Sequence, residues 1–123
     1  MEVFYTKDHD WIAVDNGLAT VGITDYAQAQ LGDILFVQLP PPGTIVQKGK
    51  EAALVESIKA ASDIFSPVTG TVREANGVIE RQPALVNLSP EREGWFFRVD
   101  LADPTELDGL LTAQAYQERV KRL

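Results

Sequence analysis

Lys59 is the residue with the plainest chemical use, because it stands between two short apolar segments in the run Val55–Asp63. The flanking residues favour strands, whereas the small step Ala60–Ser62 favours a tight reversal of the chain. The sequence therefore predicts a β-hairpin with Lys59 at or near its tip. An exposed lysine amine, with a reference pKa of about 10.4, is a poor nucleophile unaided but a good substrate for a modifying enzyme. The alternative is an ordinary solvated surface lysine.

Pro67 and Gly70 punctuate two further strand-like pieces that follow the hairpin. A lysine hairpin followed by a Pro-x-x-Gly turn resembles the attachment site of lipoyl and biotinyl carrier domains. Biotinyl domains typically carry methionines on both sides of the lysine, and the lipoyl domains of 2-oxoacid dehydrogenases typically carry Asp-Lys-Ala. The run Glu56–Asp63 has neither pattern and is similar instead to the glycine cleavage H-protein family.

Other segments resemble the same family, so the resemblance covers nearly the whole chain. Its motifs are specific in combination. The segments are Tyr5–Trp11, Ala19–Gln28, Gln30–Pro40, Pro83–Asn87, Glu93–Trp95 and Asp103–Leu107.

The resemblance implies a carrier rather than a catalyst, with one lipoate per chain joined by an amide bond to Lys59. In the family, a pyridoxal-phosphate-dependent glycine decarboxylase (P protein) loads an aminomethyl group onto the lipoyl arm. A folate-dependent aminomethyltransferase (T protein) removes that group, and dihydrolipoyl dehydrogenase (L protein) reoxidises the arm. A lipoate ligase or a lipoyl/octanoyl transferase is the implied modifying enzyme. A mobile arm lets one carrier present the same sulfur to several active sites.

The resemblance also implies a cleft that protects the aminomethyl amine from water, with a carboxylate near the amine. The matching residues here are His9, Asp10 and Asp63. Asp10 stands where the family usually has Glu, which shortens the carboxylate arm by one methylene. Structural roles are the alternative: His9 as a packed or solvated histidine, and the two aspartates as surface charges or turn caps.

The composition limits the possible functions. The 123 residues are 45% hydrophobic and contain no Cys, so one globular core suffices and any sulfur chemistry must come from a cofactor. The net charge of −7 disfavours nucleic-acid binding and suits a carrier that visits enzymes with basic faces. Neither a secretory signal nor a membrane span is readable, and we expect a cytoplasmic monomer. We find no nucleophile–base pair, metal-ligand cluster or phosphate loop, so an independent enzyme is disfavoured.

The N-terminal part should contain strands and one helix. Asp15–Gly17 separates two strand-like segments as a hairpin turn. Thr24 can cap a helix that Gly32 ends, and the segment Ile34–Leu39 then returns to strand.

The middle of the chain contains a short internal repeat, because Ala53–Glu56 recurs as Ala84–Asn87 with one substitution. Coincidence is one interpretation. If the repeat reflects a structural duplication, it predicts two similar half-sheets packed face to face, with a lysine in only one of the two hairpins.

The C-terminal part should hold a last strand over Trp95–Val99 and then two helices. Asp103 is the expected cap of the first, with Pro104 and Glu106 in its first turn, and the second should begin at about Thr112. We therefore expect a single lipoyl-carrier domain over 1–123 that is mainly β with a few short helices. It should be a lipoyl-domain-like pseudo-symmetric β-sandwich, or barrel-sandwich hybrid, with its core over about 17–100 and helices over about 103–123 packed on it.

Two other functions stay open. A different lipoyl or biotinyl carrier is disfavoured by the absence of flanking methionines and by the segment Tyr5–Trp11. An H-like lipoyl protein that relays lipoate or carries sulfur intermediates would share both Lys59 and the fold. The sequence does not distinguish this last function from a role in glycine cleavage.

Overall fold

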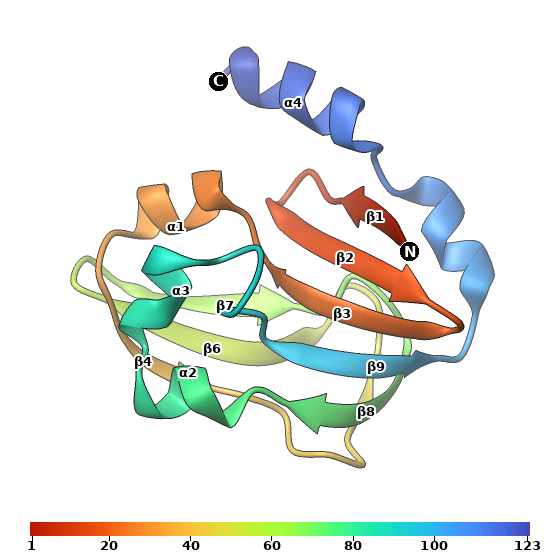
Figure 1. Cartoon of the computed structure of the whole chain (residues 1–123), viewed down its shortest axis with the longest axis horizontal. Coiled ribbons are helices and arrows are strands. Elements are labelled where there is room, and N and C mark those ends of the chain that lie inside the picture. The colour runs from red at the N-terminus through yellow and green to blue at the C-terminus, as the bar shows by residue number, and fades with distance from the viewer.

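Two antiparallel β-sheets enclose one hydrophobic core in the computed structural model, which describes all 123 residues (Figure 1). The larger sheet has six strands in the spatial order β1-β2-β3-β9-β8-β5. These strands are β1 (Glu2–Tyr5), β2 (Asp10–Asp15), β3 (Leu18–Ile23), β5 (Ile45–Val46), β8 (Gly70–Ala75) and β9 (Phe97–Leu101). The smaller sheet has the order β4-β6-β7, with β4 (Ile34–Gln38), β6 (Glu51–Ser57) and β7 (Ala61–Phe65). The predicted mainly β sandwich is confirmed.

Short helices fill the connections between the strands. Helix α1 (Asp25–Leu31) joins β3 to β4, and α2 (Gly77–Arg81) and α3 (Ala84–Leu88) lie between β8 and β9. A 3₁₀ helix, η1 (Pro104–Gly109), and α4 (Ala113–Lys121) follow the last strand. In Figure 1, α4 lies outside the two sheets, on the side of β1. None of these helices is both long and apolar enough to cross a membrane.

Local signals determined several of these boundaries as predicted. The turn between β2 and β3 has positive φ at both Asn16 (50°) and Gly17 (78°), the conformation that matches the twist of a two-residue hairpin. The Thr24 hydroxyl caps α1 by accepting a hydrogen bond from the Ala27 amide at 3.3 Å. Gly32 ends that helix with a φ of 79°, which a residue with a side chain rarely adopts.

The core is made of the inward-facing residues of both sheets. Ile12, Val21, Val55 and Val99 have no measurable exposure, and neither do Phe97, the first residue of β9, and Phe96 just before it. Burying apolar surface on this scale is the main source of stability for a domain of this size. Trp11 is buried, and its indole N–H donates to the Pro90 carbonyl at 3.0 Å.

The predicted repeat is wrong at the level of secondary structure. Ala53–Glu56 lies in β6, whereas Ala84–Asn87 lies in α3. The second copy follows a helix and Pro83, and its Asn87 side chain bonds to the backbone of Gly32 and Ile34 rather than to a neighbouring strand. The segment therefore supports the α1–β4 turn and forms no second hairpin.

The C-terminal helices also differ in part from the prediction. Asp103 does cap the first one, by accepting from the Thr105 amide, but that element is a 3₁₀ helix. The Glu106 carboxylate accepts hydrogen bonds from the amide and hydroxyl of Thr69 at 2.7 and 2.8 Å instead of serving its own helix end. Thr112 caps α4 as predicted.

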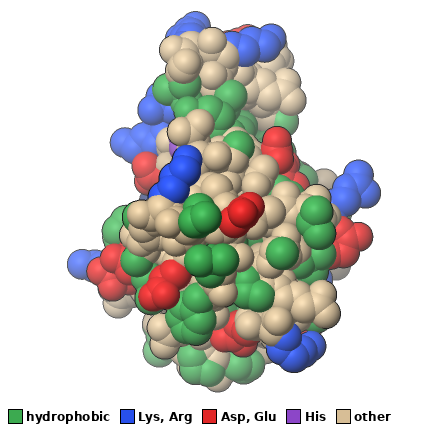
Figure 2. Space-filling model, turned by 90° about the vertical axis from the view of Figure 1, so that its left-hand side faces the viewer, with side chains coloured by type: hydrophobic (Ala, Val, Ile, Leu, Met, Phe, Trp, Pro, Cys, Tyr) green, Lys and Arg blue, Asp and Glu red, His purple; other side chains and the backbone are tan.

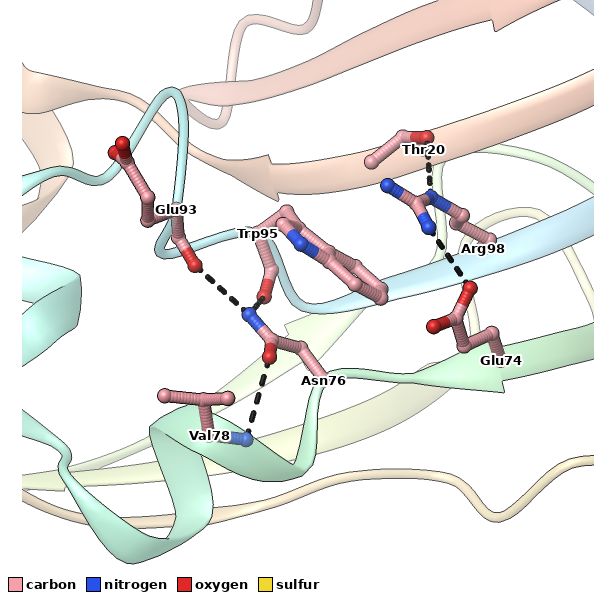
Figure 3. Close-up of polar contacts among 7 residues, drawn as sticks. All are labelled: Thr20, Glu74, Asn76, Val78, Glu93, Trp95 and Arg98. Carbon is pink, nitrogen blue, oxygen red and sulfur yellow. Dashed lines mark hydrogen bonds and ion pairs between the residues drawn. The ribbon is translucent and has the colours of Figure 1, made fainter.

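Asn76 fixes the corner between β8 and α2 (Figure 3). It is 6% exposed, and its amide group donates to the carbonyls of Glu93 and Trp95 at 2.9 and 2.7 Å. Its oxygen accepts from the Val78 amide at 3.2 Å. This one side chain therefore ties the corner to the loop that precedes β9.

Candidate functional site

Lys59 lies at the tip of the hairpin between β6 and β7, as the sequence predicts, and its side chain is exposed. The hydroxyl of Ser57 accepts from the amides of Lys59 and Ala60 at 3.2 and 3.3 Å. The Ser57 amide and hydroxyl both donate back to the Ala60 carbonyl. One serine therefore holds the turn in shape without using the lysine side chain.

The residues at and just after the end of α1 form hydrogen bonds with the hairpin tip. The Lys59 amine donates to the Gln30 carbonyl at 3.4 Å, and the Ile58 amide donates to the Asp33 carbonyl at 2.9 Å. A Cβ atom on Gly32 would lie 3.5 Å from Cε of Lys59, so the lysine stem passes directly over that glycine. The amine is oriented and still open to an enzyme.

A cavity of about 200 Å³ lies beside this lysine, bordered by β7, the turn before β2, and α1. We call it the β7 cavity. Gln30 lines the cavity, and its carbonyl accepts a hydrogen bond from the Lys59 amine, so the lysine contacts one residue of the cavity wall. The structure thus brings His9, Asp10 and Asp63 together in one cavity next to Lys59. The lining residues are Asp8, His9, Asp10, Ile23, Ala27, Gln30, Leu31, Ser62, Asp63, Ile64 and Phe65.

Asp10 supplies the buried carboxyl of the β7 cavity. It is 7% exposed, and one of its oxygens accepts from the Thr6 hydroxyl at 3.1 Å. Burial raises the pKa of the Asp10 carboxyl to about 7, outweighing the Thr6 hydrogen bond, and the charge of Asp8 acts in the same direction as burial. The group is therefore poised between its neutral and charged forms near neutral pH. A cation placed in the cavity would favour the carboxylate.

His9 forms part of the wall between the β7 cavity and α4. Its backbone has a φ of 70°, and its ring nitrogen Nδ1 lies 2.8 Å from the Tyr116 hydroxyl. The His9 ring also packs on Tyr26 with the ring centroids 4.5 Å apart. Burial first, and then the charge of Arg119, hold the pKa of His9 below its ordinary value, while Asp8 opposes them. The imidazole is accordingly neutral at neutral pH.

Asp63 lies on β7, opposite Leu54 of β6, with its side chain exposed. It forms the rim of the β7 cavity rather than its interior. The two aspartates therefore differ in environment: Asp10 is desolvated and hydrogen-bonded, whereas Asp63 faces water.

Sequence reasoning missed several residues of this site. Gln30 and Phe65 line the cavity, Thr6 bonds Asp10, and Tyr116 bonds His9. Thr6 precedes Asp10 by four residues, which is a weak local signal for a turn closed by a threonine. Tyr116 lies 107 residues from His9, and no sequence signal connects them.

Comparisons with known proteins give one consistent family. A family model described as Glycine cleavage H-protein matches residues 3–123. A glycine cleavage system H protein from Bradyrhizobium diazoefficiens is 51% identical over 113 residues, covering 92% of this chain and 93% of the relative. One from Parvibaculum lavamentivorans is 51% identical over 122 residues, covering 99% and 98%. The crystal structure of a glycine cleavage system H protein from Mycobacterium marinum superposes with a TM-score of 0.89 at 36% identity, covering 98% of this chain and 97% of that one.

Proposed function

This chain belongs to the glycine cleavage H-protein family, and we propose that it carries lipoate on Lys59 and shuttles aminomethyl groups between the enzymes of that system. The observation that supports this proposal most directly is the exposed Lys59 amine at a hairpin tip, adjoining a cavity that contains Asp10. The proposed loading enzyme is the glycine decarboxylase and the proposed unloading enzyme is the aminomethyltransferase. Dihydrolipoyl dehydrogenase would reoxidise the arm, and a lipoate ligase or transferase would attach it. We place this shuttle in the cytoplasm and propose that the carrier acts as a monomer.

The residues at the hairpin fit a lipoyl group. The Lys59 stem is held over Gly32 while its amine stays exposed, so an acyl group can be joined to Nζ without moving the backbone. Forming the amide removes one positive charge and takes the net charge from −7 to −8. The lipoyl group, when attached, supplies the dithiolane sulfur that holds the aminomethyl group and the disulfide that is reduced and reoxidised.

The β7 cavity fits the task of protecting an amine between enzymes. Ile23, Leu31 and Ile64 give it an apolar wall, and Asp10 supplies a buried carboxyl. We propose that Asp10 ionises to hold the protonated amine, while Asp63 adds negative charge at the rim. Restricting water at this point would slow hydrolysis of the loaded group.

The surface around Lys59 carries features of a docking face. Leu35, Phe36, Ile58 and Leu88 are large apolar residues that are 45–81% exposed. A bulge in the pairing of β4 with β6 turns both Leu35 and Phe36 outward. Figure 2 looks onto this side and shows hydrophobic and acidic side chains interspersed. We propose that the partner enzymes present an apolar patch with a basic rim to this face.

Lipoylation of the purified protein is the experiment that tests the carrier function. Wild-type protein incubated with lipoate, ATP and a lipoate ligase should gain one lipoyl group by intact mass, and peptide mapping should place it on Lys59. Lys59→Ala should gain none, whereas Lys50→Ala, which removes another exposed lysine, should be modified like the wild type. Modification of another lysine, or none, would contradict the proposal.

A reconstituted system then separates glycine cleavage from the related H-like function. Lipoylated protein mixed with the three enzymes, glycine, tetrahydrofolate and NAD should release carbon dioxide and ammonia. A protein that is lipoylated normally but supports no turnover, and that passes its lipoyl group to other carriers, would instead be a lipoate-relay protein.

A further inference from the structure

We propose that Tyr116, on α4, is a positioning residue for the β7 cavity, because its hydroxyl holds His9 as the neutral tautomer protonated on Nε2. The proposal deepens the function proposed above and rests on it only where it concerns the arm. It gives α4 a role in a cavity to which it contributes no lining residue.

Tyr116 is well placed to control a hydrogen bond. It is 6% exposed, and its ring stacks on Tyr5 with centroids 4.8 Å apart and planes 9° from parallel. Its hydroxyl oxygen lies 2.8 Å from Nδ1 of His9 and 2.7 Å from the hydroxyl oxygen of Thr24. The stacked ring fixes where that hydroxyl lies, so the three polar atoms form a chain of fixed geometry.

The direction of the protons in this chain follows from Thr24. Thr24 is 1% exposed, and its hydroxyl oxygen already accepts from the Ala27 amide. The hydroxyl proton needs an acceptor, and the one within hydrogen-bonding distance is the Tyr116 oxygen. Thr24 therefore donates to Tyr116, and Tyr116 donates to Nδ1 of His9. The opposite direction would leave a buried hydroxyl proton without a partner, which is unfavourable.

The backbone restricts His9 to this arrangement. The His9 amide donates to the Thr6 carbonyl at 3.1 Å, and the Thr24 amide donates to the His9 carbonyl at 2.9 Å. A φ of 70° is uncommon for a residue other than glycine, and these two bonds hold it. With Nδ1 accepting, the ring proton is on Nε2.

A neutral His9 has a direct consequence for a cationic cargo. The charged and titratable groups that face its ring are Asp8 from the preceding turn, Arg119 and Tyr116 from α4, and Tyr26 from α1. An imidazolium in this wall would repel a protonated amine held by Asp10. A neutral ring that donates from Nε2 leaves the cavity's negative charge available to the amine.

The test is a measurement of the His9 tautomer by ¹⁵N NMR of the imidazole ring in unmodified protein at neutral pH. Since His9 is the only histidine, its signals need no assignment. We expect the Nε2-protonated tautomer to outnumber the other by about tenfold in the wild type. In Tyr116→Phe, which keeps the ring and loses the hydroxyl, we expect a clearly smaller excess of the Nε2-protonated tautomer and a higher His9 pKa.

Tyr5→Phe is the matched control. It also removes a tyrosine hydroxyl, from the ring that stacks on Tyr116, but this hydroxyl forms no hydrogen bond with His9. It should keep the wild-type tautomer, and amide spectra should show that both variants are folded. The proposal would be overturned if His9 were protonated mainly on Nδ1 in the wild type, or if the ratio of the two tautomers were the same in Tyr116→Phe as in the wild type.

Release of ammonia from aminomethyl-loaded protein tests the consequence for the arm. We expect roughly three- to tenfold faster release from Tyr116→Phe than from Tyr5→Phe. Equal rates would overturn the claimed effect on the arm. If Lys59 accepts no lipoyl group while the NMR result is as expected, the proposed function fails and the positioning of His9 by Tyr116 stands.

Discussion

The Lys59 hairpin and the Asn76 corner are both turns shaped by one polar side chain, yet their hydrogen bonds differ in reach. The Ser57 side chain bonds only within Ser57–Ala60, three residues away at most. Asn76 bonds to carbonyls 17 and 19 residues further along the chain. The Ser57 side chain shapes its turn through local bonds alone, whereas the Asn76 side chain joins segments that only the complete fold brings together.

This difference suggests that presentation and stability are assigned to separate turns. Changes at the hairpin should alter modification while leaving the fold intact, because its contacts are local and exposed. Changes at the corner should do the reverse, because buried polar groups would lose their partners. Substitutions at both turns test that separation, and a substitution of Asp10 tests whether the cavity beside the hairpin also affects stability.

Lys59→Arg should give the largest effect, a complete loss of lipoylation, because guanidinium does not replace the amine as an acyl acceptor. The free energy of unfolding should stay within about 0.5 kcal/mol of the wild type, since the side chain is exposed. Intact mass and urea unfolding of the same preparations measure the two quantities. A large loss of stability would show that the hairpin also supports the core.

Asp10→Asn should change the pH dependence of stability. The folded carboxyl has a pKa of about 7, whereas an unfolded aspartate titrates near about 3.9. The folded state binds the Asp10 proton more tightly than the unfolded chain does. Protonation of Asp10 therefore adds its full contribution to the free energy of unfolding below about pH 4, and this contribution is lost as the pH rises to about 7. The variant should gain up to about 4 kcal/mol relative to the wild type over that range.

The measurement is the free energy of unfolding from urea titrations at pH 4, 6 and 8. Asp63→Asn is the matched control, because Asp63 lines the same cavity but is exposed, and it should run parallel to the wild type. If the free energy of unfolding of Asp10→Asn followed the wild type at all three pH values, ionising the buried Asp10 carboxyl would not destabilise the fold.

Asn76→Ala should destabilise the fold by about 2–3 kcal/mol, because it leaves two carbonyls without their donor. Lipoylation of the folded protein should proceed at the wild-type rate. Glu74→Ala is the control on the neighbouring strand; it removes only the exposed pair with Arg98 and should cost about 0.5 kcal/mol or less. Slower lipoylation of Asn76→Ala would break the proposed separation.

Ser57→Ala should give the smallest effect on stability, about 0.5–1 kcal/mol, since the bonds it removes are exposed. The rate of lipoylation should fall several-fold, because the tip then samples more conformations before the enzyme binds. Initial rates at limiting ligase measure this. An unchanged rate would show that the ligase itself orders the turn.

The sequence predicted features that depend on neighbouring residues. The Lys59 hairpin, the Asn16–Gly17 turn and the Thr24 cap each follow from short patterns, and all three are present. The resemblance of the motifs also led to His9, Asp10 and Asp63, which meet in one cavity.

Features that depend on distant contacts could not be predicted. The segments Ala53–Glu56 and Ala84–Asn87 are almost identical, yet one is a strand and the other a helix, because pairing with neighbours decides the outcome. Glu106 fits a capping pattern but bonds Thr69, and Tyr116 lies in the predicted second helix but bonds His9. Each partner became visible only with the complete fold.

The bond from the Lys59 amine to the Gln30 carbonyl has a consequence for the arm itself. An amide nitrogen retains one proton, so acylated Lys59 can keep the same bond that the free amine makes. The root of the tether would then already point toward the β7 cavity, and its far end would explore a smaller volume than a freely rotating arm. If the chain is the carrier proposed above, that restriction would raise the effective concentration of an attached group at the cavity, and a partner enzyme would break only one weak, exposed hydrogen bond to draw the arm away.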